Sequence, residues 1–559
     1  MQQPPPWLLV GTPLLILWTI WISTYTGTDL LNNSSPKLHG NFLHITDLHP
    51  DPNYKTNATA RSSCHRRKND TSILKKPPHM KVGRSGAWGA PATICDTPIR
   101  LINATFDWLA TNWADNLDFI IWTGDSSRHD SDEKKPRKFE EILELNQMMA
   151  DKFLTAFSAT KHLHPRRNKK APKLIPIVPS LGNNDVYPSN IIEQGPNNIL
   201  DSYMNIWSPF IPKSQLDSFK RGGYYVSEVI PKKLIVVSMN TLYFFESNTA
   251  VRGCQAPDEP GTIEMQWLNK VLHKARKKGM KAYVIGHVAP SKKRYTRSCW
   301  NKYGRIAHKY HDIILGHLYG HANMDHFYFI RSKSGKTKTP FSPTINSKED
   351  DSNYETIVEE ESNTAEPVEP SSSSLSEEVQ TEENGEDDKV KANVYDIDNY
   401  VHRLLDHYKE VPPITEKMAY DYSVINVNPS VIPTFFPALR IYQYNTTELT
   451  NVNNVDTTSK KSYKEANENP HQIPEYEVEY TTKGDYQMTD LTINSWLGLA
   501  RRIAGDGIKG KLWKKFRNHI MVGTRDVVKN RKAVMKCEQG RDCSRVKAPE
   551  DYLASLGEY

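Results

Sequence analysis

The sequence predicts an α/β fold, because short apolar runs typical of buried strands alternate with stretches of helical pattern. The strand-like runs occupy residues 42–46, 119–122, 174–178, 234–239, 283–285, 313–315 and 326–330. The helical patterns between them cover residues 99–113, 139–157 and 263–277. With 559 residues the chain is too long for one compact core, so we expect one large domain with additions.

One internal segment has a composition that does not support folding. Residues 332–394 are rich in Ser, Glu, Pro and Thr, and residues 349–388 contain sixteen acidic residues and no basic one. Such a segment cannot bury enough apolar area to offset its ordering entropy, so we expect a disordered acidic insert. Because the whole chain has a net charge of +7, the rest is strongly basic. That charge suggests a polyanionic ligand or an anionic surface, although simple solubility explains it equally well.

The N-terminus predicts a membrane anchor. Residues 7–25 carry no charge, and such a length crosses a hydrocarbon core of about 30 Å as a helix. The alternative is a cleaved signal peptide, but the preceding MQQPPP has no Lys or Arg and no clear cleavage site follows. We therefore favour a retained anchor. Either way, glycosylation sequons suggest a lumenal or extracellular body. They occur at Asn32, Asn33, Asn57, Asn69, Asn103 and Asn445.

These features divide the chain into consecutive segments. They are a short cytosolic tail (1–6), the anchor (7–25), a lumenal linker (26–39), an α/β core (40–331), the acidic insert (332–394), a segment that completes the core (395–445), a polar linker (446–490) and a basic C-terminal region (491–559). The last region mixes Trp and Leu with many Lys and Arg. Two interpretations stay open for it: a helix that lies on a membrane or an acidic partner, and a cap on the core.

Six cysteines suit an oxidising compartment, where disulfides form. None belongs to a CxxC pair, so a zinc knuckle is not expected. Sequence order suggests the pairs Cys64–Cys95, Cys254–Cys299 and Cys537–Cys543, but six cysteines permit fifteen connectivities. The pairing is therefore a working hypothesis.

Five polar motifs each follow one of the apolar runs. They are Asp47-Leu48-His49, Gly124-Asp125, Gly182-Asn183-Asn184-Asp185, Gly286-His287 and Gly320-His321-Ala322-Asn323. Ligands of α/β sheets gather beyond the carboxyl ends of the strands, and Asp, Asn and His are common metal donors. One Gly-His or Gly-Asp pair is more often structural than functional. Five such motifs at strand ends instead predict a metal site.

This order of motifs resembles the calcineurin-like metallophosphoesterase superfamily. The segment Trp122-Thr-Gly-Asp-Ser-Ser-Arg-His129 is similar to the acid-sphingomyelinase-like branch, and within that branch the chain most resembles the fungal vacuolar endopolyphosphatases, over roughly residues 40–330 and 395–445. The features behind the last resemblance are the N-terminal anchor, the GNND motif and residues 316–326. The resemblance implies a four-layer α/β/β/α sandwich. It also implies a vacuolar, single-pass membrane protein whose catalytic domain is lumenal.

The resemblance assigns metal ligands residue by residue. Asp47 and His49 would hold a first ion, Asp125 would bridge two ions, and Asn183, His287 and His321 would hold the second. The family usually has a histidine where this chain has Asn323. An amide oxygen is a harder donor, which favours manganese, magnesium or cobalt over zinc. His317 is a spare candidate whose offset departs from the family pattern.

The resemblance also points to the chemistry. Two ions would activate a water for in-line attack on phosphorus. Many relatives carry a histidine where this chain has Asn184, so the leaving oxygen needs another partner. His129 is the candidate, as a general acid or as a stabiliser of transition-state charge. A solvated loop histidine is the structural alternative.

The expected substrate is inorganic polyphosphate, cleaved at internal phosphoanhydride bonds. Basic loop residues would bind this linear polyanion, with Arg66, Arg67, Lys292, Lys293 and Arg294 as candidates. Two alternatives remain, a lumenal or secreted phosphodiesterase of the sphingomyelinase-like type and an inactive, membrane-tethered polyanion-binding protein. No nucleic-acid partner is expected, and a homo-oligomer is left open.

Overall fold

A computed structural model describes residues 39–67, 84–158, 174–332, 400–413, 415, 419–445, 452–459, 473 and 476–524. Their strands form two six-stranded sheets and one short pair, β2 (Pro50–Asp51) with β3 (Thr97–Pro98). The first sheet has the order β14 (Glu477–Thr481), β13 (Val452–Ser459), β12 (Ala438–Asn445), β1 (His39–Ile45), β4 (Phe119–Trp122) and β5 (Ile177–Pro179). The second has the order β10 (His326–Arg331), β11 (Tyr422–Val427), β9 (Ile314–Tyr319), β8 (Lys281–Ile285), β7 (Leu234–Ser238) and β6 (Tyr225–Ile230).

Both sheets contain a run of parallel strands, although β1 pairs antiparallel with β12 in the first sheet. In the first sheet β1 pairs in parallel with β4, and β4 with β5. In the second, β7, β8, β9 and β11 are parallel neighbours. Every residue of β4 and β7 is buried, which explains why these strands are continuous apolar runs rather than alternating ones. Because parallel strands end at the same edge, the residues that follow them are brought together.

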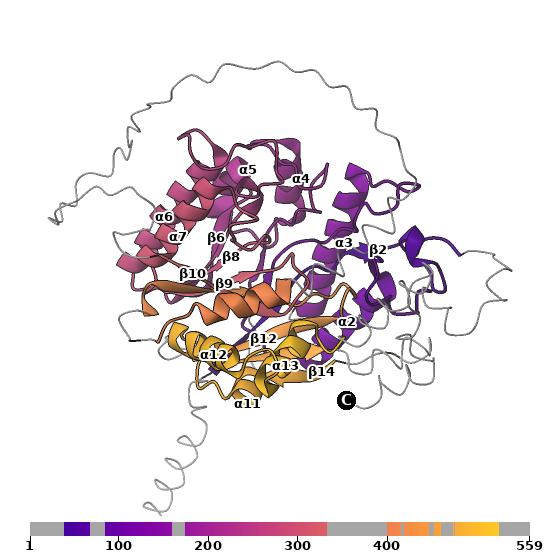
Figure 1. Ribbon diagram of the computed structural model, residues 1–559. Helices are drawn as coiled ribbons and strands as arrows, with labels where there is room; N and C mark the ends of the chain where they lie inside the picture. Colours follow the sequence, from indigo (N-terminus) through magenta and orange to yellow (C-terminus); the bar gives the residue numbers. More distant parts are fainter. Residues whose placement is uncertain are drawn as a thin grey trace, which may run out of the picture.

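The two sheets pack face to face, and helices cover their outer faces. Phe42 of β1 stacks on Phe119 of β4 with ring centroids 4.6 Å apart and meets Tyr283 of β8 at 5.1 Å. Helices α2 (Ile99–Asn112) and α3 (Phe139–Phe157) lie beside the first sheet, while α6 (Pro260–Lys277) and α7 (Arg297–Lys309) lie beside the second (Figure 1). The predicted α/β class and its layering are therefore confirmed for the described residues.

Smaller elements complete this core. Helices α4 (Asn198–Ile206) and α5 (Leu216–Gly222) connect β5 to β6, and short 3-10 turns occur at Ala60–Ser62, Lys213–Gln215 and Thr241–Tyr243. Residues 400–409 are helical, and the Tyr408 hydroxyl donates to the Phe327 carbonyl at 2.6 Å. This helix packs against the edge of the second sheet.

The segment 446–490, expected to be a polar linker, instead contributes to the fold. Its described residues include β13 and β14, which extend the first sheet beyond β12, and helix α11 (Thr482–Tyr486). The physical reason is its place at a sheet edge. Four of the five residues of β14 are at least partly exposed, so its composition resembles that of a linker.

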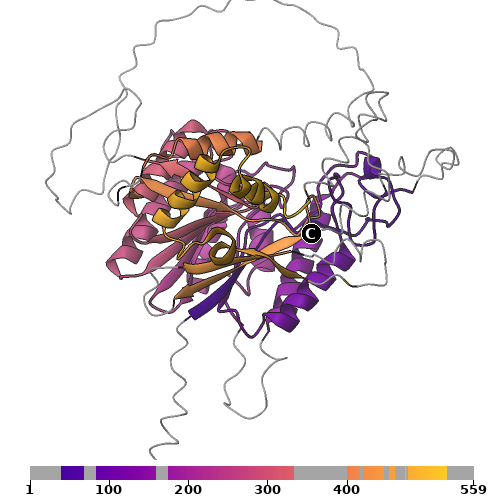
Figure 2. The ribbon, with the colours of Figure 1, turned by 60° about the horizontal axis from the view of Figure 1, so that its bottom comes forward.

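The basic C-terminal region forms helices α12 (Ile493–Asp506) and α13 (Lys511–Ile520). Their apolar faces are buried: Trp496 lies 4.6 Å from Phe327 of β10, and Phe516 lies 5.6 Å from it. Figure 2 shows the two helices over the orange strands of the C-terminal half. Capping of the core is thus the correct interpretation of their apolar face.

Disulfides Cys64–Cys95 and Cys254–Cys299 are present as the order of the cysteines suggested. Several predictions lie outside the described residues: the anchor at 7–25, the sequons at Asn32, Asn33 and Asn69, the side chain of Asn445, the pair Cys537–Cys543, and the acidic insert apart from Ser332. Within the described ranges, no helix is both long and apolar enough to cross a membrane.

Candidate metal centre

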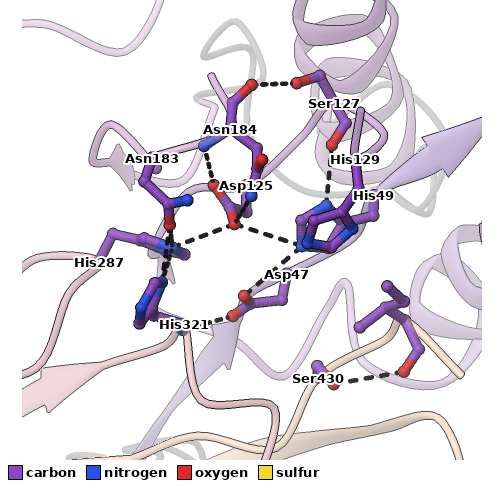
Figure 3. Close-up of polar contacts among 12 residues, drawn as sticks. Asp47, His49, Asp125, Ser127, His129, Asn183, Asn184, His287, His321 and Ser430 are labelled. Carbon is purple, nitrogen blue, oxygen red and sulfur yellow. Dashed lines mark hydrogen bonds and ion pairs between the residues drawn. The ribbon is translucent and has the colours of Figure 1, made fainter. Parts of the chain in front are cut away.

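The five motifs converge at one edge of the two sheets. The loops after β1 and β4 are joined by backbone hydrogen bonds, from Asp47 N to Gly124 O at 3.1 Å and from His49 N to Asp125 O at 3.1 Å. The loop after β9 joins them, because the backbone N–H of His321 donates to Asp47 Oδ2 at 2.9 Å. Figure 3 shows the resulting group of side chains.

Asp125 lies at the centre of this group. Its Oδ2 is 3.3 Å from Nε2 of His49 on one side and 3.2 Å from Nε2 of His287 on the other. His49 Nε2 is also 3.7 Å from Asp47 Oδ1. One carboxylate oxygen therefore contacts the imidazoles of His49 and His287, which belong to two neighbouring groups of candidate ligands, as a bridging ligand must.

The second cluster contains Asn183, His287 and His321. Asn183 Oδ1 lies 3.0 Å from His287 Nε2 and 2.7 Å from His321 Nδ1, and the two imidazole nitrogens are 3.3 Å apart. Two triads could each hold a cation, with ligand atoms within 4.8 Å of one another: His49, Asp125 and His129, and Asp125, His287 and His321. Both contain Asp125, as the sequence predicts for a bridging residue.

Several polar atoms at this site lack a hydrogen-bond partner. Within the described residues, the buried atoms Asp47 Oδ1 and His49 Nε2, 3.7 Å apart, form no hydrogen bond, and neither does Asn323 Oδ1 in the loop after β9. An unsatisfied buried polar atom is costly, so such atoms among these motifs fit a site that binds cations. The donor set of carboxylates, imidazoles and amides suits divalent ions.

Neighbouring groups orient the donors. Carbonyl oxygens of Ser127 and Thr123 accept from Nδ1 of His49 at 2.8 Å and of His287 at 2.7 Å, which leaves both Nε2 atoms facing Asp125. Asn184 donates twice to Asp125, from its backbone N to Oδ1 and from Nδ2 to Oδ2, both at 2.8 Å. In the sequence Asn184 stands only where many relatives have a histidine, but in the fold its amide holds the central carboxylate in place.

The electrostatics of the site favour positive charge. Burial alone would lower the pKa of His49 and of His287, but Asp125 and neighbouring carboxylates raise both pKa values to about 9. Burial would raise the pKa of Asp125, yet the two histidines hold it well below its usual value. Burial and the charge of Arg294 lower the pKa of His321. The field around Asp125 is thus negative enough to hold cationic charge at two places.

The backbone is strained at the same residues. Asp47, His49, Asp125, His321 and Asn323 all have positive φ, between 38° and 70°. Residues other than glycine rarely adopt this backbone conformation, and it persists only where the surrounding structure enforces it. Gly320 makes room for the arrangement, since a Cβ atom there would lie 2.1 Å from Thr46 Oγ1 and 2.5 Å from Asp47 Oδ2. The strain is consistent with a functional site.

His129 lies against the first cluster. Its ring stacks on that of His49 with centroids 4.0 Å apart, and its side chain is 35% exposed. Asp96 receives hydrogen bonds from both the backbone N–H and Nδ1 of His129, each at 2.7 Å. Burial would raise the pKa of Asp96, but His129 lowers it. Asp96 is not among the residues predicted from the sequence. Its one distinguishing feature there is its position next to Cys95, whose disulfide with Cys64 fixes the loop.

The remaining candidates have different positions. Asn323 follows His321 in the loop after β9, and its unpartnered oxygen makes it available as a ligand. His317 is buried and contacts the Tyr303 hydroxyl at 2.6 Å, and burial lowers its pKa to about 3. It belongs to neither triad of candidate ligands.

The basic residues divide in the same way. Arg66 donates from two nitrogens to Asp132, at 2.6 and 2.8 Å, so its charge is compensated within the protein, and its contact with substrate stays a prediction. Arg67 is exposed, and its Nε donates to the Thr56 carbonyl. Arg294 is half-buried and its charge reaches His321, while Lys292 and Lys293 are exposed beside it.

Comparisons with known proteins agree with this site. Residues 40–322 match the family model described as calcineurin-like phosphoesterase, and residues 421–544 match the acid sphingomyelin phosphodiesterase C-terminal region.

Three relatives are each named endopolyphosphatase. The protein of Cryptococcus neoformans is 36% identical over 74% of this chain and 59% of its own length. That of Neurospora crassa is 46% identical over 53% of this chain and 38% of its own. That of Saccharomyces cerevisiae is 34% identical over 80% of this chain and 67% of its own. The matched part thus spans between about two fifths and two thirds of these relatives.

Proposed function

Because the chain belongs to the calcineurin-like phosphoesterase family, we propose that it is a metal-dependent endopolyphosphatase that cleaves internal phosphoanhydride bonds of inorganic polyphosphate. The observation that carries the proposal is the position of Asp125, whose Oδ2 lies between His49 and His287. Relatives with the corresponding name over most of this chain support the choice of substrate.

The chain's own residues would hold two divalent ions. Asp47, His49 and Asn323 would bind one, Asn183, His287 and His321 the other, and Asp125 both. When bound, such ions polarise phosphoryl oxygens and lower the pKa of an attacking water. The amide oxygen of Asn323, a harder donor than imidazole, favours manganese, magnesium or cobalt over zinc in the first position.

His129 would act on the substrate directly. Asp96 accepts the hydrogen bond from Nδ1, so Nε2 of His129 is the ring nitrogen that would contact the substrate. In that position Nε2 can donate a proton to the leaving oxygen or stabilise its negative charge. Asp96 is then a positioning residue, since it fixes the ring of His129 and contacts no substrate.

Basic side chains would bind the polyanion around the metal centre. Arg294 is the best placed of the predicted contacts, because its charge already acts on His321. Lys292 and Lys293 extend positive charge outward from it. A substrate with one negative charge per phosphate unit binds such a surface through counterion release, so its affinity depends steeply on salt.

A direct assay tests the proposed function. Purified protein is incubated with manganese and either long-chain polyphosphate or a phosphodiester, and the products are followed on gels and as released phosphate. Endo-cleavage predicts intermediate chain lengths early in the reaction. Turnover of the phosphodiester alone would favour the sphingomyelinase-like alternative, and no turnover of either substrate would favour a polyanion-binding protein.

We place the enzyme in the vacuole membrane, held by residues 7–25 with its catalytic domain in the lumen. Two disulfides support an oxidising compartment. Asn57 and Asn103 are exposed and therefore accessible to modification. Fractionation of cells that express the full chain, with glycosidase treatment, tests this placement. Release of the protein by carbonate without detergent, or no mobility change after glycosidase, would contradict it.

A further inference from the structure

The outer face of α12 and α13 carries a surplus of positive charge. From Leu491 to Thr524 the chain contains seven Lys or Arg residues, and Asp506 is its one acidic residue. The inner face buries Trp496, Trp513 and Phe516 in the core. The fold explains the apolar half of these helices, but it does not explain the cationic half.

Some of these charges are engaged by the protein itself. Lys515 Nζ lies 2.7 Å from Asp485 Oδ1, and Arg502 donates to the Tyr486 carbonyl at 2.5 Å. The carboxylate of Asp506 accepts from the backbone N–H groups of Leu512 and Trp513, at 2.7 and 3.2 Å, and so caps α13. The one acidic group of the region is therefore directed into the helix end.

Four cations remain available, and we call them the C-terminal ridge: Arg501, Lys509, Lys511 and Lys514. All four are exposed, and none forms an ion pair with another described residue. Lys511 and Lys514 are three residues apart on α13 and so project from the same side of it. Uncompensated cations on neighbouring helices form a surface for an anionic ligand.

The ridge is connected to the candidate metal centre. The C-terminal end of α13 contacts the loop that carries His321 and Asn323, since the Asp325 N–H donates to the Ile520 carbonyl at 3.0 Å. Buried contacts of Asp325 with Arg440 and with the Tyr480 hydroxyl fix this junction. Ten helical residues rise about 15 Å, so Lys511 and Lys514 lie within roughly one helix length of that loop.

We propose that the C-terminal ridge is a second binding site for polyphosphate, which holds a distant part of a long chain while the metal centre cleaves elsewhere. The proposal rests on the proposed function. A linear polyanion carries charge at every unit, so a chain that occupies the metal centre can extend along α13 and contact lysines, which bind phosphate as point charges. A short chain cannot reach both places, so the ridge selects long substrates.

An anionic membrane is the competing partner of such a surface. Ile508, 51% exposed beside Lys509, is the feature that favours it. A helix that inserts into a membrane interface presents a continuous apolar face. Here the large apolar side chains of α12 and α13 point into the core, which leaves Ile508 isolated and favours the soluble polyanion.

Charge reversal on the ridge tests the proposal. The double variant Lys511→Glu/Lys514→Glu should raise KM for long-chain polyphosphate about tenfold and flatten its dependence on salt, because two cationic contacts are lost. Its kcat, and its KM for tripolyphosphate, should stay at the wild-type values. The matched control is the double variant Lys274→Glu/Lys277→Glu on α6, where both lysines are also exposed. It should change neither KM nor kcat.

Each outcome decides between the interpretations. If the ridge variant and the α6 control had the same KM for long-chain polyphosphate, the proposed second binding site would be refuted. Loss of binding to phosphatidylserine vesicles with unchanged polyphosphate kinetics would also overturn it and assign the surface to a membrane. Binding of labelled long-chain polyphosphate in EDTA separates the ridge from catalysis. If wild type hydrolyses no polyphosphate but binds it more tightly than the ridge variant, the proposed function fails and the binding site stands.

Discussion

The candidate metal centre has two halves, and they differ in how many of their candidate ligand atoms have hydrogen-bond partners within the protein. In the first half, Asp47 Oδ1, His49 Nε2 and Asn323 Oδ1 are buried without hydrogen-bond partners. In the second half, Asn183, His287 and His321 contact one another at 2.7–3.3 Å. The first half is richer in oxygen donors and the second in imidazole nitrogens. One centre can therefore offer two different environments for metal ions, and the two positions should differ in affinity and in metal preference.

Removal of the residue shared by the halves should have the largest effect. Asp125→Ala takes away the one carboxylate that contacts both His49 and His287, so kcat should fall by at least about 10³-fold. The variant should still fold, because Asp125 is not part of the apolar core. Turnover is the measurement, with circular dichroism as the check on folding. The exposed Asp107→Ala on α2 is the control, and turnover in Asp125→Ala similar to that of this control would refute the shared role.

His129→Ala should have the next largest effect, on the first half alone. Loss of a proton donor or of charge stabilisation at the leaving oxygen lowers kcat by about 10²-fold or more. Binding of metal at the second half should not change, since His129 belongs only to the triad of His49. Single-turnover rates and metal titration separate the two effects. A changed metal stoichiometry with unchanged chemistry would make His129 a ligand instead.

Asp96→Asn should have a smaller effect in the same direction. An amide can still accept one hydrogen bond from His129, so the ring keeps part of its orientation, and kcat should fall roughly tenfold. KM should change little, because Asp96 does not contact substrate. Asp96→Glu, which retains the charge, should recover part of the rate. If Asp96→Asn lowered thermal stability and left kcat intact, Asp96 would be structural only.

Asn323→His should have the smallest effect on rate and the most informative effect on metal preference. An imidazole in place of the amide oxygen softens the first half and should favour zinc over manganese there, by roughly tenfold in relative affinity. Competition titrations with the two metals measure the shift. An unchanged preference would show that Asn323 does not ligate metal, and the difference between the halves would then rest on Asp47 alone.

Much of this centre could be predicted from the sequence, because donors that follow apolar strands are local features of the chain. Asp47, Asp125 and His287 each follow shortly after a strand. Parallel pairing of β1 with β4 brings Asp47 and Asp125 to one edge of the first sheet, and packing of the second sheet against it places His287 3.2 Å from Asp125. Asp96 could not be predicted in this way. It follows no apolar strand, and its contact with His129 depends on a disulfide-linked loop.

The partner of each basic side chain could not be predicted from the sequence either. Arg66 is a basic loop residue like Arg294, yet Asp132 compensates its charge, whereas no carboxylate in the described part of the chain pairs with the four residues of the C-terminal ridge. The strand β14 was missed because it lies at the sheet edge, and an edge strand needs few apolar residues. Sequence pattern reports what a residue can do, whereas its partner across the fold decides whether it remains free to do it.

Metal stoichiometry tests the central claim most directly. Protein dialysed against manganese and freed of unbound ion should contain two ions per chain by elemental analysis, and Asp125→Ala should contain fewer than one because both halves lose a ligand. A wild-type protein that hydrolyses polyphosphate with no bound divalent ion, or an Asp125→Ala variant that keeps both ions, would contradict the account.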